Sequence, residues 1–253
     1  MHKIKDTMIC LFDEMLEQVP NFKRKTYNDI FLQAFEKYRY LVHDISDLLE
    51  NADKSEREDI MNELSMVLPD HARAKMSESS KKAEILHMDY NMNMVIYVIP
   101  ILTYSHDAFC ENLARKMVNT WNNEKITSLT LSLSSYESIA NGFKKKLCYI
   151  TTAVCEHNNK PDDCYELTAL RNYRDNYLMK TDNGKALVEE YYEIAPGIVT
   201  IINMQQNADE IYRQINKDYL TPCIHHIEAG ENDKCCDLYM QMVRDLQKRY
   251  LYS

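Results

Sequence analysis

Apolar residues recur every three to four positions along most of the chain, which is the period of an amphipathic helix. The pattern covers residues 3–19, 26–51 and 55–68 in the first part of the sequence. It returns after residue 135 and continues, interrupted by turn residues, almost to residue 250. We therefore predict a mainly α protein that is built as a multi-helix bundle.

Two segments near the middle depart from the helical period. Residues 95–99 form a short, wholly apolar run, and residues 127–134 alternate, with Leu129, Leu131 and Leu133 on one face. A short apolar run suits a buried strand or a buried helix equally well, whereas alternation is typical of a strand. We expect the two segments either to pair as a small two-stranded β element or to be helical.

Capping residues, prolines and glycines predict where the helices begin and end. Ser55 with Glu58 is a capping-box pattern, and the helix that it opens is expected to stop before Pro69. The pairs Asn183-Gly184 and Pro196-Gly197 predict two further breaks. We divide the chain into an N-terminal helical region, residues 1–143, and a C-terminal helical domain, residues 144–253.

The composition excludes several classes of function. The chain of 253 residues contains only four glycines, so neither of the usual glycine-rich phosphate-binding loops can be written from them. Its net charge of −9 argues against a surface for nucleic acid. The low glycine content also agrees with a helical protein, because helices use glycine mainly at their ends.

Eight cysteines raise the question of the compartment. Residues 1–13 mix charged and apolar side chains and lack the continuous apolar core of a signal peptide. The longest apolar stretch, residues 94–102, is too short to span a bilayer. We therefore predict a cytoplasmic protein without a membrane partner, whose cysteines are reduced thiols.

Three separated strings in the second half resemble a known family. The string Cys-Tyr-Ile-Thr-Thr-Ala-Val at 148–154 is followed by Leu-Arg-Asn-Tyr-Arg-Asp at 170–175 and by a third part at 184–198. Together they resemble the CFI-box segment of many bacterial proteins, with Tyr149 and Tyr173 in place of phenylalanine. That family has no assigned activity, so the resemblance implies a shared architecture for this C-terminal segment and no function.

The same segment concentrates reactive side chains. On a helix, Cys148, Thr152 and Cys155 lie at i, i+4 and i+7 and share a face. Arg171 and Asp175 are likewise one turn apart and are expected to pair. An arginine beside Cys148 would lower the pKa of the thiol and favour the thiolate. The candidate catalytic residues are Cys148, Thr152, Arg171 and Asp175, and the candidate binding residues are Thr151, Arg174, Tyr191 and Tyr192.

Two functions and one purely structural interpretation follow from this cluster. The first function is a helical binding protein whose pocket takes a small anionic ligand or a protein partner. The alternative is an enzyme that uses Cys148 with Arg171 and Asp175, with or without the help of a metal. The structural interpretation is that small residues allow two helices to pack closely and that the arginine and aspartate brace one of them.

Metal binding is not favoured, and the sequence indicates no particular cofactor. Cys155, His157 and Cys164 are the weak candidate ligands near the cluster, and they lack the short cysteine spacing of common zinc sites. A second group of cysteines and histidines follows at Cys223, His225, His226, Cys235 and Cys236.

Overall fold

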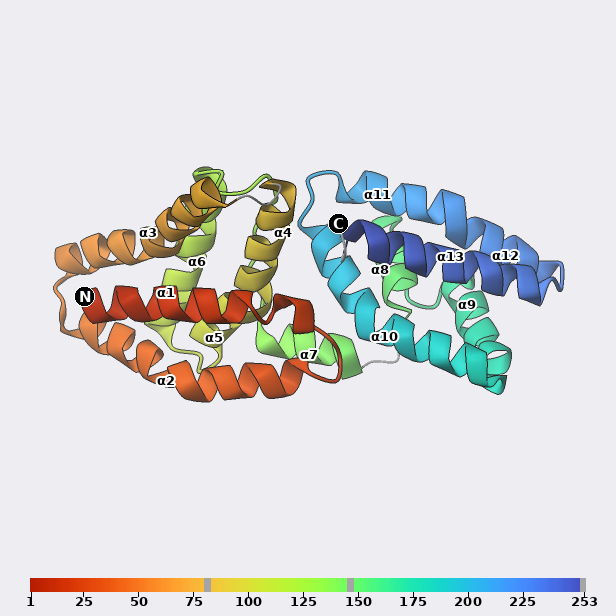
Figure 1. Cartoon of the computed structure of the whole chain (residues 1–253), viewed down its shortest axis with the longest axis horizontal. Helices are drawn as coiled ribbons and strands as arrows, with labels where there is room; N and C mark the ends of the chain where they lie inside the picture. The colour runs from red at the N-terminus through yellow and green to blue at the C-terminus, as the bar shows by residue number, and fades with distance from the viewer. Residues whose placement is uncertain (80–82, 145–147, 251–253) are drawn as a thin grey trace. The chain divides into compact units, whose positions relative to one another are not determined.

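The computed structural model describes residues 1–79, 83–144 and 148–250 (Figure 1). These residues are mainly helical, as the apolar period predicts, and they contain no strand. The chain forms two compact units. Unit 1 consists of Met1–Phe22 and Thr26–Asn141, and unit 2 consists of Lys23–Lys25 and Gly142–Ser253.

Unit 1 is a bundle in which α1 packs against α2, α3 and α4, while α3 runs beside α6 (Figure 1). Its core holds Phe12, Phe31 and Trp121, which are fully buried. The elements are α1 (His2–Leu16), η1 (Val19–Asn21), α2 (Tyr27–Asn51), α3 (Lys54–Glu78), α4 (Ala83–Asn93), η2 (Met94–Val98), α5 (Ile99–Thr103), α6 (Ala108–Asn123) and α7 (Tyr136–Lys144), the last of which crosses the boundary between the units.

The predicted β element is wrong, although its two segments do touch. Residues 94–98 form the π-helical turn η2, and residues 127–134 are an irregular segment. Ser134 donates its hydroxyl hydrogen to the carbonyl oxygen of Val95. The two segments are thus joined by a side-chain hydrogen bond and not by the backbone hydrogen bonds of a sheet. Five consecutive buried residues in a helix have the same apolar pattern as a buried strand, and the sequence cannot separate the two.

Several predicted helix ends are also wrong. The N-cap of α3 is Asp53, which accepts hydrogen bonds from two backbone amides, and the helix runs through Pro69 to Glu78. Pro69 is tolerated there because the flanking Leu68 and Ala72 are fully buried, and this packing compensates for the missing backbone hydrogen bond. In unit 2, α10 likewise continues through Pro196-Gly197.

The run Ile85–Thr103 is a single helical stretch of 19 residues that is long and apolar enough to cross a membrane by composition alone. It is longer than the apolar stretch recognised in the sequence, because the helix continues through η2. Within unit 1, 78% of its most apolar window is buried. Burial in the core therefore accounts for its apolar character.

Unit 2 is a second bundle, centred on α10, which packs against α8 and α13. The helix α9 contacts α8 and α12, so the three strings of the family-like segment lie on neighbouring helices. The elements are α8 (Tyr149–His157), α9 (Tyr165–Asn176), η3 (Leu178–Lys180), α10 (Asp182–Asn203), α11 (Ala208–Ile215), η4 (Asn216–Leu220), α12 (Thr221–Glu228) and α13 (Asn232–Tyr250).

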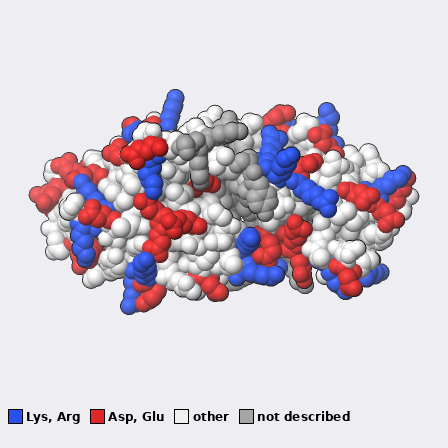
Figure 2. Space-filling model, viewed as in Figure 1, with Lys and Arg blue, Asp and Glu red and all other residues white. Residues whose placement is uncertain are grey.

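Charged side chains of both signs are interspersed over the face of the molecule shown in Figure 2. Several ion pairs among the described residues join side chains one helical turn apart, as Arg213 and Glu210 do. The expectation that the protein has no nucleic-acid partner stays a prediction.

Candidate functional site

Cys148 lies where three helices of unit 2 meet. It is the N-cap residue of α8 and is only 4% exposed. Its carbonyl oxygen accepts a hydrogen bond of 2.6 Å from the amide of Thr152, which closes the first turn of the helix. The amide of Ile150 donates instead to the hydroxyl of Tyr191 on α10, at 2.9 Å. The tyrosine thus satisfies one of the free amides at the start of α8.

Arg174 of α9 is the side chain that reaches the thiol. Its Nη1 atom donates to the hydroxyl of Tyr192 at 2.8 Å and to the sulfur of Cys148 at 3.6 Å. Its Nε and Nη2 atoms donate to the two carboxylate oxygens of Asp175 at 2.7 and 2.9 Å. The bidentate pair with Asp175 raises the pKa of Arg174 above its ordinary value, so the guanidinium stays charged.

The predicted pair between Arg171 and Asp175 is wrong. Arg171 donates two hydrogen bonds to Asp162, which lies in the turn before α9. The backbone carbonyl oxygen of Asp162 accepts one at 2.8 Å, and its carboxylate accepts the other at 2.7 Å. Asp175 is instead the partner of the adjacent Arg174. The spacing of one helical turn permits a pair but does not require it, because long arginine side chains also reach partners on neighbouring segments.

The pKa of the Cys148 thiol is raised, whereas the sequence suggested that a neighbouring arginine would lower it. Burial raises its pKa, and the opposing effects of Arg174 and Arg171 do not outweigh that burial. The nearby charge of Asp175 also disfavours the thiolate. An arginine, Arg174, does lie beside Cys148, as the sequence predicted. Its charge lowers the pKa of the thiol by less than burial raises it.

Two threonine hydroxyls near the start of α8 are unsatisfied. Thr151 is fully buried, and the Oγ1 atoms of Thr151 and Thr152 have no hydrogen-bond partner in the part of the chain that the structure describes. The hydroxyl of Tyr191, by contrast, accepts a hydrogen bond from the amide of Ile150. Buried polar atoms without partners are rare in native proteins and call for an explanation.

The cluster encloses a cavity of about 20 Å³, which Cys148, Arg174 and Tyr191 line together with apolar side chains of α9, α10 and α13. A volume of this size has room for about one water molecule. Of the eight predicted site residues, only Cys148, Arg174 and Tyr191 line this cavity, and its volume is too small for a whole ligand.

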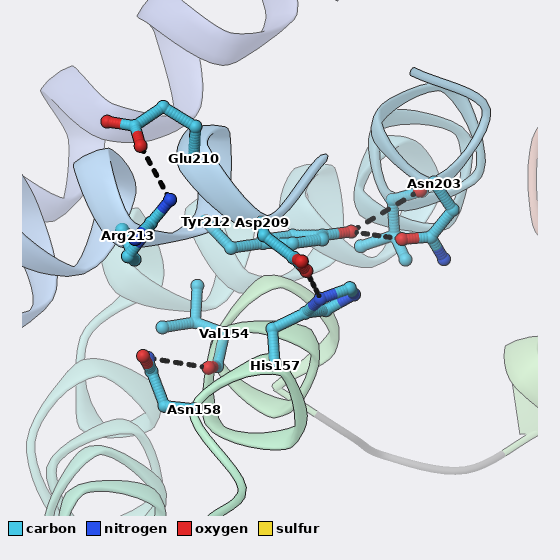
Figure 3. A network of polar contacts seen from close by, with 9 residues as sticks. Val154, His157, Asn158, Asn203, Asp209, Glu210, Tyr212 and Arg213 are labelled. Atoms are coloured by element: carbon cyan, nitrogen blue, oxygen red, sulfur yellow. Dashed lines mark hydrogen bonds and ion pairs between the residues drawn. The ribbon is translucent and has the colours of Figure 1, made fainter. Parts of the chain in front are cut away.

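The weak metal candidates separate into two groups. The sulfur atoms of Cys155 and Cys164 lie 3.5 Å apart. His157 is directed elsewhere: its Nδ1 atom lies 2.5 Å from the carboxylate of Asp209, and its ring stacks on Tyr212 at 4.4 Å (Figure 3). Within the described residues, no group of three cysteine, histidine or acidic side chains is placed to hold a metal ion.

The second cysteine and histidine group is likewise dispersed. The sulfur of Cys223 lies 3.9 Å from the carbonyl oxygen of Cys235, inside the packing of α12 and α13. His226 pairs with Glu231 at 2.7 Å. All eight cysteines are free thiols, as the sequence predicts.

Sequence reasoning missed three residues that complete these contacts, namely Asp162, Asp209 and Tyr239. Asp162, in the turn before α9, is the partner of Arg171, and the ring of Tyr239 packs against that of Tyr191 with 5.7 Å between their centroids. Asp209 follows His157 by 52 positions, and no spacing rule connects residues so far apart. Only the packing of α8 against α11 brings that pair together.

Comparison with family models, with curated proteins and with solved structures finds no match to this chain. The resemblance of residues 148–198 to the CFI-box segment stays a prediction. The function must therefore be argued from the geometry of the cluster itself.

Proposed function

We propose that unit 2 is an anion-binding module in which Arg174 recognises the carboxylate or phosphate group of a small ligand. In the structure described above, Asp175 occupies the position that the ligand anion would take on the guanidinium. Binding is then an exchange of one anion for another, and the charge of Arg174 remains paired throughout.

The observation that carries the proposal is the difference in exposure within the ion pair. The side chain of Arg174 is 14% exposed, whereas that of Asp175 is 57% exposed. The second pair repeats the arrangement, with Arg171 at 25% and Asp162 at 71%. In both pairs the cation is the inner partner and the carboxylate is the outer one, so an anion from solvent can displace the carboxylate without uncovering the arginine.

The position of α8 also supports an anion at this place. The N-terminus of α8 lies beside Arg174 through Cys148, and a helix N-terminus favours negative charge. The cavity beside Cys148 has room for only about one water molecule, so the ligand anion would bind outside it, at the position of Asp175.

A cysteine-dependent enzyme is the weaker candidate. Such an enzyme needs a reachable thiolate and a base, whereas Cys148 is buried with a raised pKa. The nearest sequence candidate for the base, His157, pairs with Asp209 instead.

Calorimetric titration with inorganic phosphate tests the proposal. Charge-assisted hydrogen bonds contribute about 1.5–3 kcal/mol, so Arg174→Gln is expected to weaken phosphate binding roughly 10- to 100-fold. The matched control is Arg213→Gln, which removes an exposed arginine paired with Glu210 on another helix of the same unit and should bind as the unaltered protein does.

A second variant keeps the test decisive if Arg174→Gln fails to fold. Asp175→Asn removes the competing carboxylate and leaves the guanidinium in place, so it is expected to strengthen phosphate binding several-fold. Equal phosphate affinity in Asp175→Asn, Arg213→Gln and the unaltered protein would overturn the proposal.

A further inference from the structure

The sulfur atoms of Cys155 and Cys164 lie close enough to be joined. They are 3.5 Å apart, so forming a bond of about 2.05 Å needs a shift of about 1.5 Å. Cys155 is in the last turns of α8, and Cys164 is the N-cap residue of α9. The two residues are therefore the ends of one short connection between helices.

Backbone hydrogen bonds hold that connection in a tight turn. The carbonyl oxygen of Cys155 accepts from the amides of Asn158 and Lys160, at 3.1 and 2.8 Å. The amide of Cys164 donates to Pro161 at 3.0 Å. The turn thus holds the backbone at both cysteines in place, so that their side chains can approach each other.

The two thiols differ in their access to solvent. Cys155 is buried at 3% exposure, and burial together with the hydrogen bond between Cys155 and Cys164 raises its pKa to about 12. Cys164 is only partly buried. The ammonium group of Lys160 interacts electrostatically with both sulfurs while it pairs with Glu166. Cys164 is therefore the thiol that is more accessible to a reagent from solvent, and Cys155 is the buried thiol next to it.

We propose that Cys155 and Cys164 form a redox-active dithiol that a peroxide oxidises to an intramolecular disulfide. Cys164 first releases its proton. Its thiolate sulfur attacks one peroxide oxygen, the O–O bond breaks and Cys164 becomes a sulfenic acid, while the departing hydroxide takes up the released proton and leaves as water. The sulfur of Cys155 then attacks the sulfur of Cys164, the S–O bond breaks, and the departing hydroxide takes the proton of Cys155 as a second water. Two thiols lose two electrons, and one peroxide gains them.

The other cysteines do not combine proximity with access in this way. Cys10 is exposed, but it lies in unit 1, on α1. Cys223 and Cys235 lie near one another, but both are fully buried. Cys148 is buried and contacts Arg174. The modification is expected at one pair only, and it does not depend on the anion-binding function proposed above.

The test treats the full-length protein with hydrogen peroxide, alkylates the remaining thiols and maps the products by mass spectrometry. Cleavage after Tyr149 and after Glu156 places Cys155 and Cys164 on different peptides and separates both from Cys148. The expected result is a cross-linked pair of peptides carrying Cys155 and Cys164, lighter than the two reduced peptides by two hydrogen atoms. In Cys10→Ser, the matched control, the same cross-link is expected.

Two variants test the order of the steps. Cys155→Ser is expected to stop at the sulfenic acid of Cys164, which dimedone traps, and Cys164→Ser is expected to yield no cross-link and no trapped product at position 155. The proposal is overturned if Cys155 and Cys164 are both still alkylated at a peroxide concentration that oxidises Cys10. It is equally overturned if Cys164 is linked to Cys148 instead of Cys155.

Discussion

Replacing Tyr191 by phenylalanine removes one hydroxyl from the centre of unit 2. That hydroxyl accepts a hydrogen bond of 2.9 Å from the amide of Ile150. Ile150 is fully buried, so its amide cannot turn to water when the acceptor is lost. The substitution leaves this donor unsatisfied at the start of α8 while it preserves the packing of the ring.

The expected cost follows from that one donor. A buried donor without a partner costs about 1–3 kcal/mol, so Tyr191→Phe is expected to lower the free energy of unfolding of unit 2 by about 1–3 kcal/mol. Domains of this kind are stable by about 5–15 kcal/mol. The effect is therefore large enough to shift a urea denaturation midpoint clearly.

Urea denaturation followed by far-UV circular dichroism measures the loss. The only tryptophan, Trp121, lies in unit 1, so its fluorescence monitors that unit separately. The matched control is Tyr165→Phe, which removes an exposed hydroxyl that donates to Glu228 and should cost less than about 0.5 kcal/mol. If the two variants unfold at the same urea concentration, the assignment of Tyr191 as the capping group of α8 is wrong.

Two further predictions concern other parts of the chain. Gly184→Ala would place a Cβ atom 2.1 Å from the carbonyl oxygen of Leu178. We therefore expect the substitution to destabilise unit 2 by at least about 2 kcal/mol, which would be measured as a lower thermal midpoint. An unchanged midpoint would contradict that close approach. Burial raises the pKa of Asp13, but hydrogen bonds and charges from His71 and Lys75 outweigh it, and the net pKa is lowered. A lowered folded-state pKa means that ionised Asp13 stabilises unit 1 above the unfolded pKa of about 3.9 and that this contribution is lost as the pH falls through the folded value. Asp13→Asn is therefore expected to reduce the acid sensitivity of tryptophan fluorescence below about pH 4, and an unchanged acid transition would contradict it.

The helical class could be predicted from the sequence because the apolar period is a property of single helices. The ends of helices were less predictable. Pro69 and the Pro196-Gly197 pair look like breaks, yet buried neighbours hold both helices together across them. Residues 95–99 are apolar on every side, and a helix buried on all sides lacks the polar face that would identify it.

Part of the candidate cluster could be predicted from the sequence, but its pairing could not. Cys148, Arg174, Tyr191 and Tyr192 do meet, because α8, α9 and α10 pack together. The partner of Arg171 could not be foreseen, since Asp162 belongs to a turn whose path the sequence does not fix. The direction of the pKa shift of Cys148 depends on how deeply it is buried, which is a property of the packed structure.

The anion-binding role of Arg174 is the central claim, and the NMR signal of its side-chain Nε–H group tests it most directly. This group donates to Asp175 at 2.7 Å in the structure described above. Titration with inorganic phosphate is predicted to shift the Arg174 signal progressively to saturation, while the corresponding signal of Arg213 stays in place. A saturating shift confined to other arginines, or no shift of the Arg174 signal at phosphate concentrations that saturate calorimetric binding, would contradict the account.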